Sequence, residues 1–337
     1  MIKMMSLLSS PLSTPQGSRP PSPDFKVTCL CLSPDGTQAW LGDTNGYILQ
    51  KNLSGEKTIF SAQESKISCC AFSNDGMQAV TGSINGDLCV WDIKTQQRLH
   101  GCKESALISA AVISHDKQII IYVGYDNFVK VFNSLTLNLR RLPGHTDIIS
   151  CCAMSTDEKF FVTGSFDCTL RVWDRWNFSS DVFSGGHAAG VQSCAIHRKM
   201  TILVSGDDSG YIVIWNRLNK TFTKITGHDQ AVIRLEFSRD GMYLLSYSTN
   251  AIKLWNLASI AQPIATITCA LDSLVACAFM PDSLSIITSS FSGKLQLWDI
   301  HELKKRKKVN ADIMIREEYI ALRQEKNKSP KGHCTIS

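Results

Sequence analysis

The chain has 337 residues, of which 44% are hydrophobic and 19% charged, so it can bury a large core. Its formal net charge of +5 is uneven: the residues from Leu303 onward carry ten Lys or Arg and four Asp or Glu, and the rest carries 25 basic and 26 acidic residues. A nearly neutral body lacks the basic face that neutralises phosphates, which argues against nucleic-acid binding by that body.

The composition also bears on the compartment. No apolar run approaches the roughly 18 residues of a membrane-spanning helix, so no membrane association is expected. The N-terminal MIKMMSLLSS has no cleavage site of the A-x-A type, which argues against a secretory signal. Thirteen cysteines, some of them adjacent, favour a reducing compartment over a disulfide framework. We therefore expect a cytoplasmic protein.

The first segment, residues 1–24, is predicted to be disordered. Residues 9–23 (SSPLSTPQGSRPPSP) are rich in Pro and Ser and hold almost no bulky apolar side chains. Such a segment cannot offset the entropy that it loses on ordering.

A unit of about 41 residues recurs seven times over residues 25–310. Its marker is the position of Trp173 in FVTGSFDCTLRVWD (161–174). The equivalent residues are, in chain order, Lys51, Trp91, Phe132, Trp173, Trp215, Trp255 and Trp298, at steps of 40 to 43 residues. Each unit divides into short strands with turns of Asn, Asp or Gly, as in ISCCAFS (67–73), MQAVTGS (77–83), DLCVWD (87–92) and QQRLHGC (96–102). Short strands at this spacing predict an all-β protein.

The markers of the unit carry a family resemblance. Trp-Asp recurs at 91–92, 173–174 and 298–299, and Gly-His precedes several units. This pattern resembles the WD40 family, whose repeats form propeller blades of four strands. The resemblance implies a single seven-bladed all-β propeller over residues 25–310, although the length alone would favour two domains.

The end of the last blade leaves two assignments open. The seventh unit needs an outer strand after Trp298, and residues 303–309 (LKKRKKV) stand in that register. An N-terminal segment is the alternative source. In the tail, 311–337, the residues Ile315, Tyr319 and Leu322 have helical spacing and predict a short helix.

Blade four holds the residue types of a hydrolase triad in His145, Thr163 and Asp167. The family resemblance implies a different role, in which the aspartate orients the imidazole, the imidazole meets the hydroxyl, and the hydroxyl accepts the indole N–H of Trp173. We call this group the tetrad. Blades five and six repeat it in graded form with His187, Ser205, Trp215, His228, Ser246 and Trp255. A catalytic triad would occur once, so we interpret the tetrad as structural.

The aspartate position is less regular than the rest of the tetrad. In blade five Ser209 occupies it, and Asp208 lies one residue early. In blade six Asn250 occupies it, in a turn that is one residue shorter.

Two polar residues interrupt an innermost strand. Arg234 and Glu236 stand where blade four has Cys151 and Ala153, and they point the same way, which predicts an ion pair lining the ring interior. A ligand site there is the alternative. No His or Cys lies at zinc-finger spacing from the cysteines, so neither a metal nor a cofactor is expected.

The resemblance also implies a partner-binding face at the ring entrance. In WD40 proteins partners often meet two positions at the start of each innermost strand and one position before the turn aspartate. Apolar and aromatic side chains gather there in blades three and four, with one more in blade seven: Leu107, Tyr125, Ile148, Phe166 and Phe291. Such a cluster indicates an interface. The alternative is that these rings fold back over neighbouring blades.

The sequence therefore predicts a non-catalytic scaffold that recruits peptides or folded proteins. One alternative is a ubiquitin-ligase substrate adaptor, whose signature only Trp91-Asp92-Ile93-Lys94 approaches. Another is the propeller part of a larger nucleotide-binding signalling ATPase, although no GxxxxGK[ST] loop is present. A propeller-hosted enzyme would have to use Arg234 and Glu236. The basic run Lys304–Lys308 leaves nuclear localisation open, against a solvated basic segment.

Overall fold

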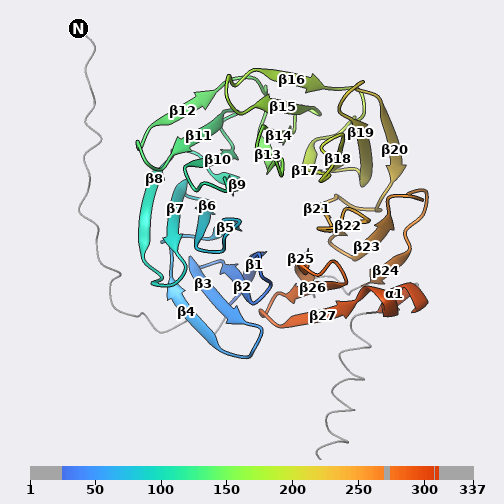
Figure 1. Cartoon of the computed structure of the whole chain (residues 1–337), viewed down its shortest axis with the longest axis horizontal. Coiled ribbons are helices and arrows are strands. Elements are labelled where there is room, and N and C mark those ends of the chain that lie inside the picture. The colour runs from blue at the N-terminus through green and yellow to red at the C-terminus, as the bar shows by residue number, and fades with distance from the viewer. Residues whose placement is uncertain (1–24, 269–273, 307, 311–337) are drawn as a thin grey trace, which may run out of the picture.

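The described part of the chain is residues 25–268, 274–306 and 308–310 of a computed structural model. Seven sheets of mainly antiparallel strands stand side by side around one axis (Figure 1). The innermost strand of each sheet contacts that of the next, and β1 (Val27–Leu32) against β25 (Leu274–Phe279) closes the ring. The seven-bladed propeller predicted from the repeats is confirmed. The predictions for residues 1–24 and 311–337 lie outside the described residues.

The strands follow the chain blade by blade, from the innermost strand outward. Blade one has β1, β2 (Gln38–Asp43), β3 (Tyr47–Asn52) and β4 (Lys57–Ser61). Blade two has β5 (Ile67–Phe72), β6 (Gln78–Ser83), β7 (Asp87–Asp92) and β8 (Arg98–Lys103). Blade three has β9 (Ile108–Ile113), β10 (Ile119–Gly124), β11 (Val129–Asn133) and β12 (Leu139–Leu142). Blade four has β13 (Ile149–Met154), β14 (Phe160–Ser165), β15 (Leu170–Asp174) and β16 (Ser180–Phe183).

The remaining blades differ at their outer edges. Blade five has β17 (Val191–Ile196), β18 (Ile202–Asp207), β19 (Tyr211–Asn216) and β20 (Phe222–Thr226). Blade six has β21 (Arg234–Phe237), β22 (Tyr243–Ser248), β23 (Ala251–Asn256), β24 (Ala265–Thr268) and β28 (Lys308–Asn310). Blade seven has β25, β26 (Ser285–Ser290) and β27 (Leu295–Asp299) within the described residues. The one helix described, α1 (Ile300–Arg306), follows β27.

A local polar turn joins the first two strands of most blades. In blade two Ser73 Oγ donates to Asp75 Oδ1 at 2.6 Å, and the same oxygen accepts from Met77 N at 3.0 Å. Gly76 then takes a φ of +68°, which glycine adopts without strain. The same Ser-x-Asp bond occurs at Ser33/Asp35, Ser114/Asp116, Ser155/Asp157 and Ser238/Asp240. The short-range sequence therefore determines where each second strand begins.

Five seams between blades share one hydrogen-bonding device. A hydroxyl on the innermost strand of one blade donates to a carbonyl on the innermost strand of the next, as Ser109 Oγ does to Ile149 O at 2.6 Å and Ser150 Oγ to Val191 O at 2.5 Å. The other donors are Thr28 and Ser68 at the same strand position, and Ser193 one position further along, which donates to Val232 O just before β21. Blades one to six are thus linked by the same chemistry.

Within the described residues, the two seams that flank blade seven lack this device. The positions equivalent to Ser150 hold Ile233 in blade six and Val275 in blade seven, which have no hydroxyl. Longer side chains and backbone groups make the connections instead: Tyr247 Oη to Leu274 O at 2.8 Å, Phe279 N to Glu236 Oε1 at 3.3 Å, Val27 N to Phe291 O at 2.9 Å, and Lys51 Nζ to Gly293 O at 2.6 Å.

The predicted closing strand at residues 303–309 is wrong. Residues Ile300–Arg306 form α1, in which Ile300 and Leu303 are buried in the same apolar cluster as Trp298. The three-residue β28 pairs in parallel with β24, so it extends blade six and not blade seven. Asp299 Oδ1 accepts from Glu302 N at 3.0 Å and caps the helix, which explains why the chain turns away from a strand here. The alternative closing segment lies within residues 1–24, outside the described part.

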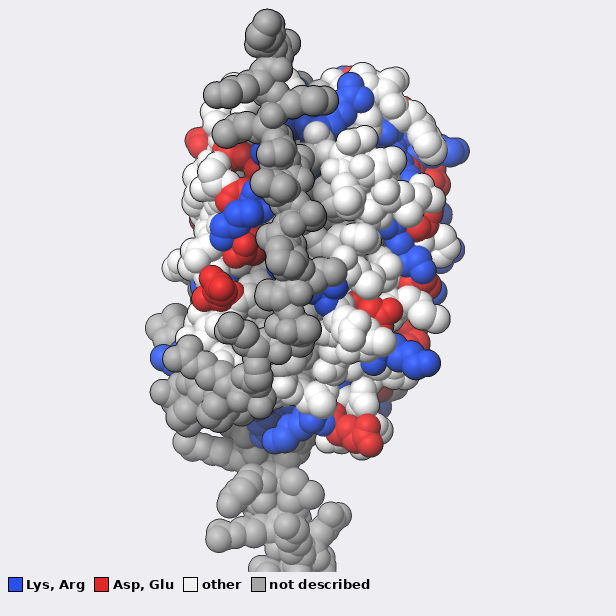
Figure 2. Space-filling view, turned by 90° about the vertical axis from the view of Figure 1, so that its left-hand side faces the viewer, with Lys and Arg blue, Asp and Glu red and all other residues white. Residues whose placement is uncertain are grey.

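The outer rim carries mixed charge. Figure 2 shows Lys and Arg interspersed with Asp and Glu on the side of the ring that faces left in Figure 1, without a broad field of one sign. Among the described residues, no helix has both the length and the apolar content needed to cross a membrane.

Candidate partner-binding face

The hydrogen bonds of the blade four tetrad are present and buried. His145 Nδ1 lies 2.7 Å from Asp167 Oδ2, His145 Nε2 lies 2.8 Å from Thr163 Oγ1, and Trp173 Nε1 donates to that hydroxyl oxygen at 2.9 Å. Burial raises the pKa of Asp167, but hydrogen bonds from His145 and Thr169 outweigh it and leave the pKa below its usual value. With Nδ1 donating to this carboxylate, Nε2 accepts from Thr163, whose oxygen accepts from the indole.

This arrangement does not present a nucleophile. Thr163 is fully buried and its hydroxyl is engaged on both sides, so no substrate carbonyl could approach it. The tetrad instead joins the loop before β13 to β14 and β15. A buried indole N–H needs such an acceptor, which is the role the geometry fills.

Blade five corrects the predicted aspartate. His187 Nδ1 contacts Asp207 Oδ2 at 2.7 Å, and neither Ser209 nor Asp208 takes this role. Asp207 ends β18 and also accepts from Tyr211 N at 2.9 Å. One carboxylate therefore both caps the turn and orients the imidazole. Sequence alignment missed it because Asp207 stands where blade four has Ser165. His187 Nε2 lies 2.6 Å from Ser205 Oγ, which accepts from Trp215 Nε1 at 2.7 Å.

Blade six keeps only part of the group. His228 Nε2 lies 2.7 Å from Ser246 Oγ, which accepts from Trp255 Nε1 at 2.8 Å. Nδ1 of His228 is buried and has no hydrogen-bond partner in the described part of the chain, so Asn250 does not take the role of the aspartate. Burial, with the charge of Lys253, lowers the pKa of His228 to about 3.

Blade three uses charged groups that sequence reasoning missed. Tyr122 Oη donates to Glu104 Oε1 at 2.8 Å, and Arg141 Nη2 pairs with Glu104 Oε2 at 2.8 Å. Lys130 is fully buried and pairs with Asp126. The signal was a glutamate at the position of the tetrad histidines and a lysine where blade four has Arg171, and each has the partner that a buried charge requires.

The predicted pair on the ring interior is confirmed. Arg234 Nη2 lies 3.4 Å from Glu236 Oε2, and Arg234 Nη1 donates to Leu30 O of blade one at 3.2 Å. Burial raises the pKa of Glu236, even with Arg234 beside it. Because Glu236 also accepts from Phe279 N, the two side chains hold blades six, seven and one together.

Metal ligands do not gather in the described part of the chain. No group of three or more His, Cys, Asp or Glu side chains there could hold an ion. Burial raises the pKa of the inner-strand thiols of Cys69 and Cys152. Thiols kept protonated in this way are poor nucleophiles and poor ligands.

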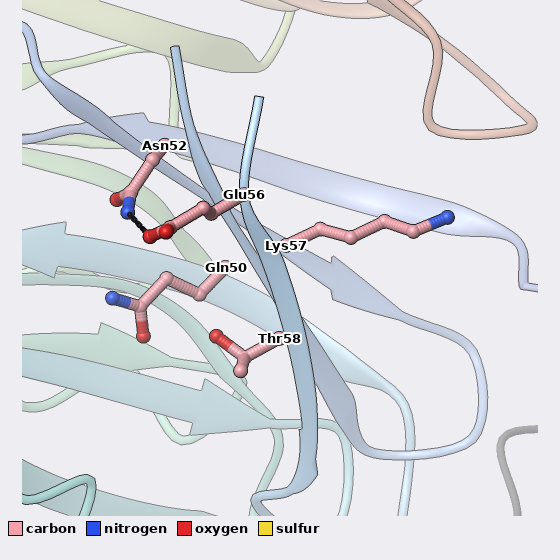
Figure 3. A pocket seen from close by; sticks show the side chains of 5 residues that line it. All are labelled: Gln50, Asn52, Glu56, Lys57 and Thr58. Carbon is pink, nitrogen blue, oxygen red and sulfur yellow. Dashed lines mark hydrogen bonds between the residues drawn. The ribbon is translucent and has the colours of Figure 1, made fainter. Parts of the chain in front are cut away.

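A shallow hollow of about 330 Å³ lies on blade one. Figure 3 shows its polar side chains, with Asn52 Nδ2 bonded to Glu56 Oε2 at 3.1 Å and Lys57 pointing away from the other four. Gln50 Oε1 accepts from Gln96 Nε2 at 2.9 Å. Asn52 and Glu56 are thus paired with each other, and Gln50 with a neighbouring blade.

The five predicted partner-binding residues divide into two places. Tyr125 N donates to Leu107 O at 3.1 Å and Phe166 N to Ile148 O at 2.9 Å, so each pair is fixed on one blade and the two blades are neighbours. We call these four residues the entrance patch. Phe291 lies on blade seven, which contacts blades six and one, so the fold does not bring it to the patch.

Exposure differs within the entrance patch. Tyr125 is 51% exposed, and Leu107, Ile148 and Phe166 are half-buried. The alternative interpretation, in which these rings fold over neighbouring blades, applies in part to Phe166, because its ring lies against Gly190 of blade five. Phe128, 39% exposed in the same turn as Tyr125, was missed by position matching and extends the apolar surface.

Comparisons with known proteins agree with this geometry. The model of the WD domain, G-beta repeat, matches residues 55–92, 137–174, 179–216, 219–256 and 261–299. The chain is 25% identical to a neurobeachin homolog of Caenorhabditis briggsae over 224 residues (58% of this chain, 8% of that protein). It is 23% identical to the target of rapamycin complex subunit wat1 of Schizosaccharomyces pombe over 206 residues (58% and 65%).

A third relative covers more of the ring. The apoptotic protease-activating factor 1 of Homo sapiens is 25% identical over 265 residues, which is 70% of this chain and 20% of that protein. The chain thus spans less than two thirds of the length of each of these relatives. The family match covers more than half of the sequence and falls on the blades described above. The chain belongs to the WD40 family.

Proposed function

We propose that this protein is a non-catalytic scaffold that recruits other proteins on the entrance patch. The observation that carries the proposal is the adjacency of Leu107, Tyr125, Ile148 and Phe166 on two neighbouring blades. Apolar and aromatic groups held at a surface by backbone hydrogen bonds favour an interface, because aromatic anchors tend to carry most of the binding energy.

Two further observations support a non-catalytic role. The hydroxyl, imidazole and carboxylate groups that could resemble a triad are buried and engaged with an indole in blades four and five. One relative is named as the subunit of a complex, the target of rapamycin complex subunit wat1. Both fit a ring whose surface, and not its interior chemistry, meets other molecules.

One relative favours a second candidate, in which this ring is the propeller part of a larger signalling protein. The match to the apoptotic protease-activating factor 1 covers 70% of this chain but 20% of that protein. An antibody raised against an exposed peptide of the ring distinguishes the candidates. An endogenous band well above 37.3 kDa supports the larger protein, and a single band at that mass contradicts it.

The scaffold proposal is tested by affinity purification with mass spectrometry. The double variant Tyr125→Ala with Phe166→Ala should weaken partner binding by at least about 2 kcal/mol, the level that defines a hot spot, with little change in melting temperature. The matched control is Trp176→Ala, since Trp176 is a 73% exposed aromatic outside the patch. Partners recovered equally by all three proteins would contradict the assignment, as would a double variant that unfolds.

A further inference from the structure

An aromatic ring and a carboxylate meet over a glycine at the border of blades four and five. The position that a Cβ would take at Gly190 lies 2.9 Å from Phe166 Cδ1 and 3.2 Å from Asp208 Oδ2. Backbone hydrogen bonds hold both neighbours: Asp208 N donates to Gly190 O at 3.0 Å, and Phe166 N donates to Ile148 O at 2.9 Å. Gln192 Nε2 donates to the other carboxylate oxygen, Oδ1, at 2.6 Å, which leaves Oδ2 directed to the glycine. Because Gly190 has no side chain, the Phe166 ring and the Asp208 carboxylate both pack against it, which brings an apolar and an anionic group close together at the surface.

Four aspartates act on the turn beside this site. Besides burial, the charges of Asp167, Asp207, Asp147 and Asp208 raise the pKa of the Cys168 thiol in the adjoining turn. Asp167 and Asp207 are paired with the tetrad histidines, whereas Asp147 and Asp208 are exposed. The negative charges of four carboxylates, from blades four and five, thus all act on the Cys168 thiol.

In blade seven, the phenylalanine ring at the equivalent position has a lysine over it. Phe291, at the position equivalent to Phe166, has Lys26 Nζ 5.8 Å from its ring centre. Eight aromatic rings in the described part of the chain have a Lys or Arg over them, and Phe166 is not among them. Phe166 therefore combines the ring with carboxylates but has no cation from the described residues.

We propose that Phe166, Asp208 and Asp147 bind the ammonium or guanidinium group of a Lys or Arg in the recruited partner. The inference rests on the proposed function and specifies its partner: a segment in which a basic residue is followed or preceded by an apolar one. The cation lies on the ring and pairs with the carboxylates. The apolar residue packs on Tyr125, Leu107 and Ile148, the other members of the entrance patch.

The test uses the full chain and a phage-displayed library of random dodecapeptides. Selected peptides are synthesised and their Kd is measured by fluorescence anisotropy. We expect enrichment of Lys or Arg next to an apolar residue. Asp147→Asn with Asp208→Asn should weaken binding by about tenfold, and more at low salt, because charge complementarity is screened by ions. Phe166→Leu, which keeps an apolar side chain but loses the π-face, should weaken it about threefold or more.

Two controls locate the effect. Asp181→Asn removes an exposed charge from the outer strand of the same blade and should leave the Kd unchanged. Replacing the basic residue of the peptide by Gln should remove the difference between wild type and the double Asn variant. Bound peptide should also slow the alkylation of Cys168, followed by mass spectrometry, but not that of the half-buried Cys102 on blade two.

The outcomes separate this inference from the function on which it rests. If Tyr125→Ala abolishes binding while the Asn variants bind normally, the scaffold stands and the cation site is wrong. If neither Tyr125→Ala nor the Asn variants change the Kd, both the scaffold proposal and the cation site are wrong. Selection of acidic or purely apolar peptides, or no enrichment at all, also overturns the cation site.

Discussion

The five seams between blades one and six and the two seams around blade seven solve one problem with different chemistry. In the first region a short hydroxyl, such as that of Ser150, donates to the next blade from a rigid strand. In the second region long side chains make the links, among them Arg234, Glu236 and Lys51. A serine loses little rotamer freedom when it makes its bond, whereas Arg, Glu and Lys lose much more.

The comparison extends to the tetrads and outer edges. Blades four and five have an aspartate on the imidazole, while blade six leaves Nδ1 of His228 without a partner in the described part of the chain. Blade seven has three strands within the described residues, and its β27 leaves Leu297 60% exposed. Stability should therefore be uneven around the ring, with blades six and seven opening before blades two to five.

The largest expected effect tests the well-ordered region. Trp173→Ala should lower the free energy of unfolding by roughly 3–5 kcal/mol, because the indole is buried, stacked on Phe161 at 6.0 Å and bonded to Thr163. Urea denaturation measures the loss, and Trp176→Ala, an exposed aromatic in the same blade, should change it by less than about 0.5 kcal/mol. A Trp173 variant as stable as wild type would show that the tetrad does not stabilise its blade.

Acid should distinguish blade six from blade four. The folded pKa of His228, about 3, lies below the unfolded value of 6.5, so the unfolded state binds the proton first and stability falls as the pH drops from 6.5 towards 3. Asp167, whose pKa is below its usual value, loses its contribution only below about pH 4. Between pH 6.5 and 5, His228 should account for a loss of about 2 kcal/mol.

Urea denaturation at several pH values checks this window. His228→Gln should make the dependence of the unfolding free energy on pH shallower by about one proton, or 1.4 kcal/mol per pH unit. Asp167→Asn is the matched change in blade four and should leave the slope above pH 5 intact. An unchanged slope in the His228 variant would contradict the assignment of the acid effect to blade six.

The smallest expected effect concerns the seams themselves. Ser150→Ala removes one neutral hydrogen bond and should lower the free energy of unfolding by about 1 kcal/mol. Arg234→Leu removes half-exposed charged bonds and should cost a similar amount, but its effect should concentrate in β25 and β1. Hydrogen exchange measured strand by strand distinguishes the effects of the two variants. Faster exchange around blade four in the Arg234 variant would contradict the division of the ring into two regions with different seams.

Much of the fold could be predicted because it is encoded by short, repeated segments. The Ser-x-Asp turns, such as that of Ser73 and Asp75, and the regular tryptophan positions each depend on residues close in sequence. The four residues of the entrance patch were predicted from the same repeat register. Asp207 was missed because a carboxylate two positions before the aligned one can still reach His187 from the end of β18.

The segment after Trp298 shows why register alone is insufficient. Asp299 and Glu302 form a capping pattern, and Ile300 and Leu303 are spaced for one helix face, so a helix signal was present. The same residues also stood in register with the outer strand that blade seven needs, so a helix and a strand were both compatible with the sequence. The outcome depended on the buried surface around Trp298 and on the free edge of β24, which the linear pattern does not reveal.

By itself, the sequence determined the number of blades, their strand order and the residues that anchor each indole, since these depend on local periodicity. Only the tertiary structure decided what joins blade seven to its neighbours, which charges are buried in blade three, and that Phe166 of blade four meets Asp208 of blade five over Gly190. The physical reason is that these contacts cross between repeats. Their energy depends on side chains about 40 residues apart, and no period in the sequence specifies such a pairing.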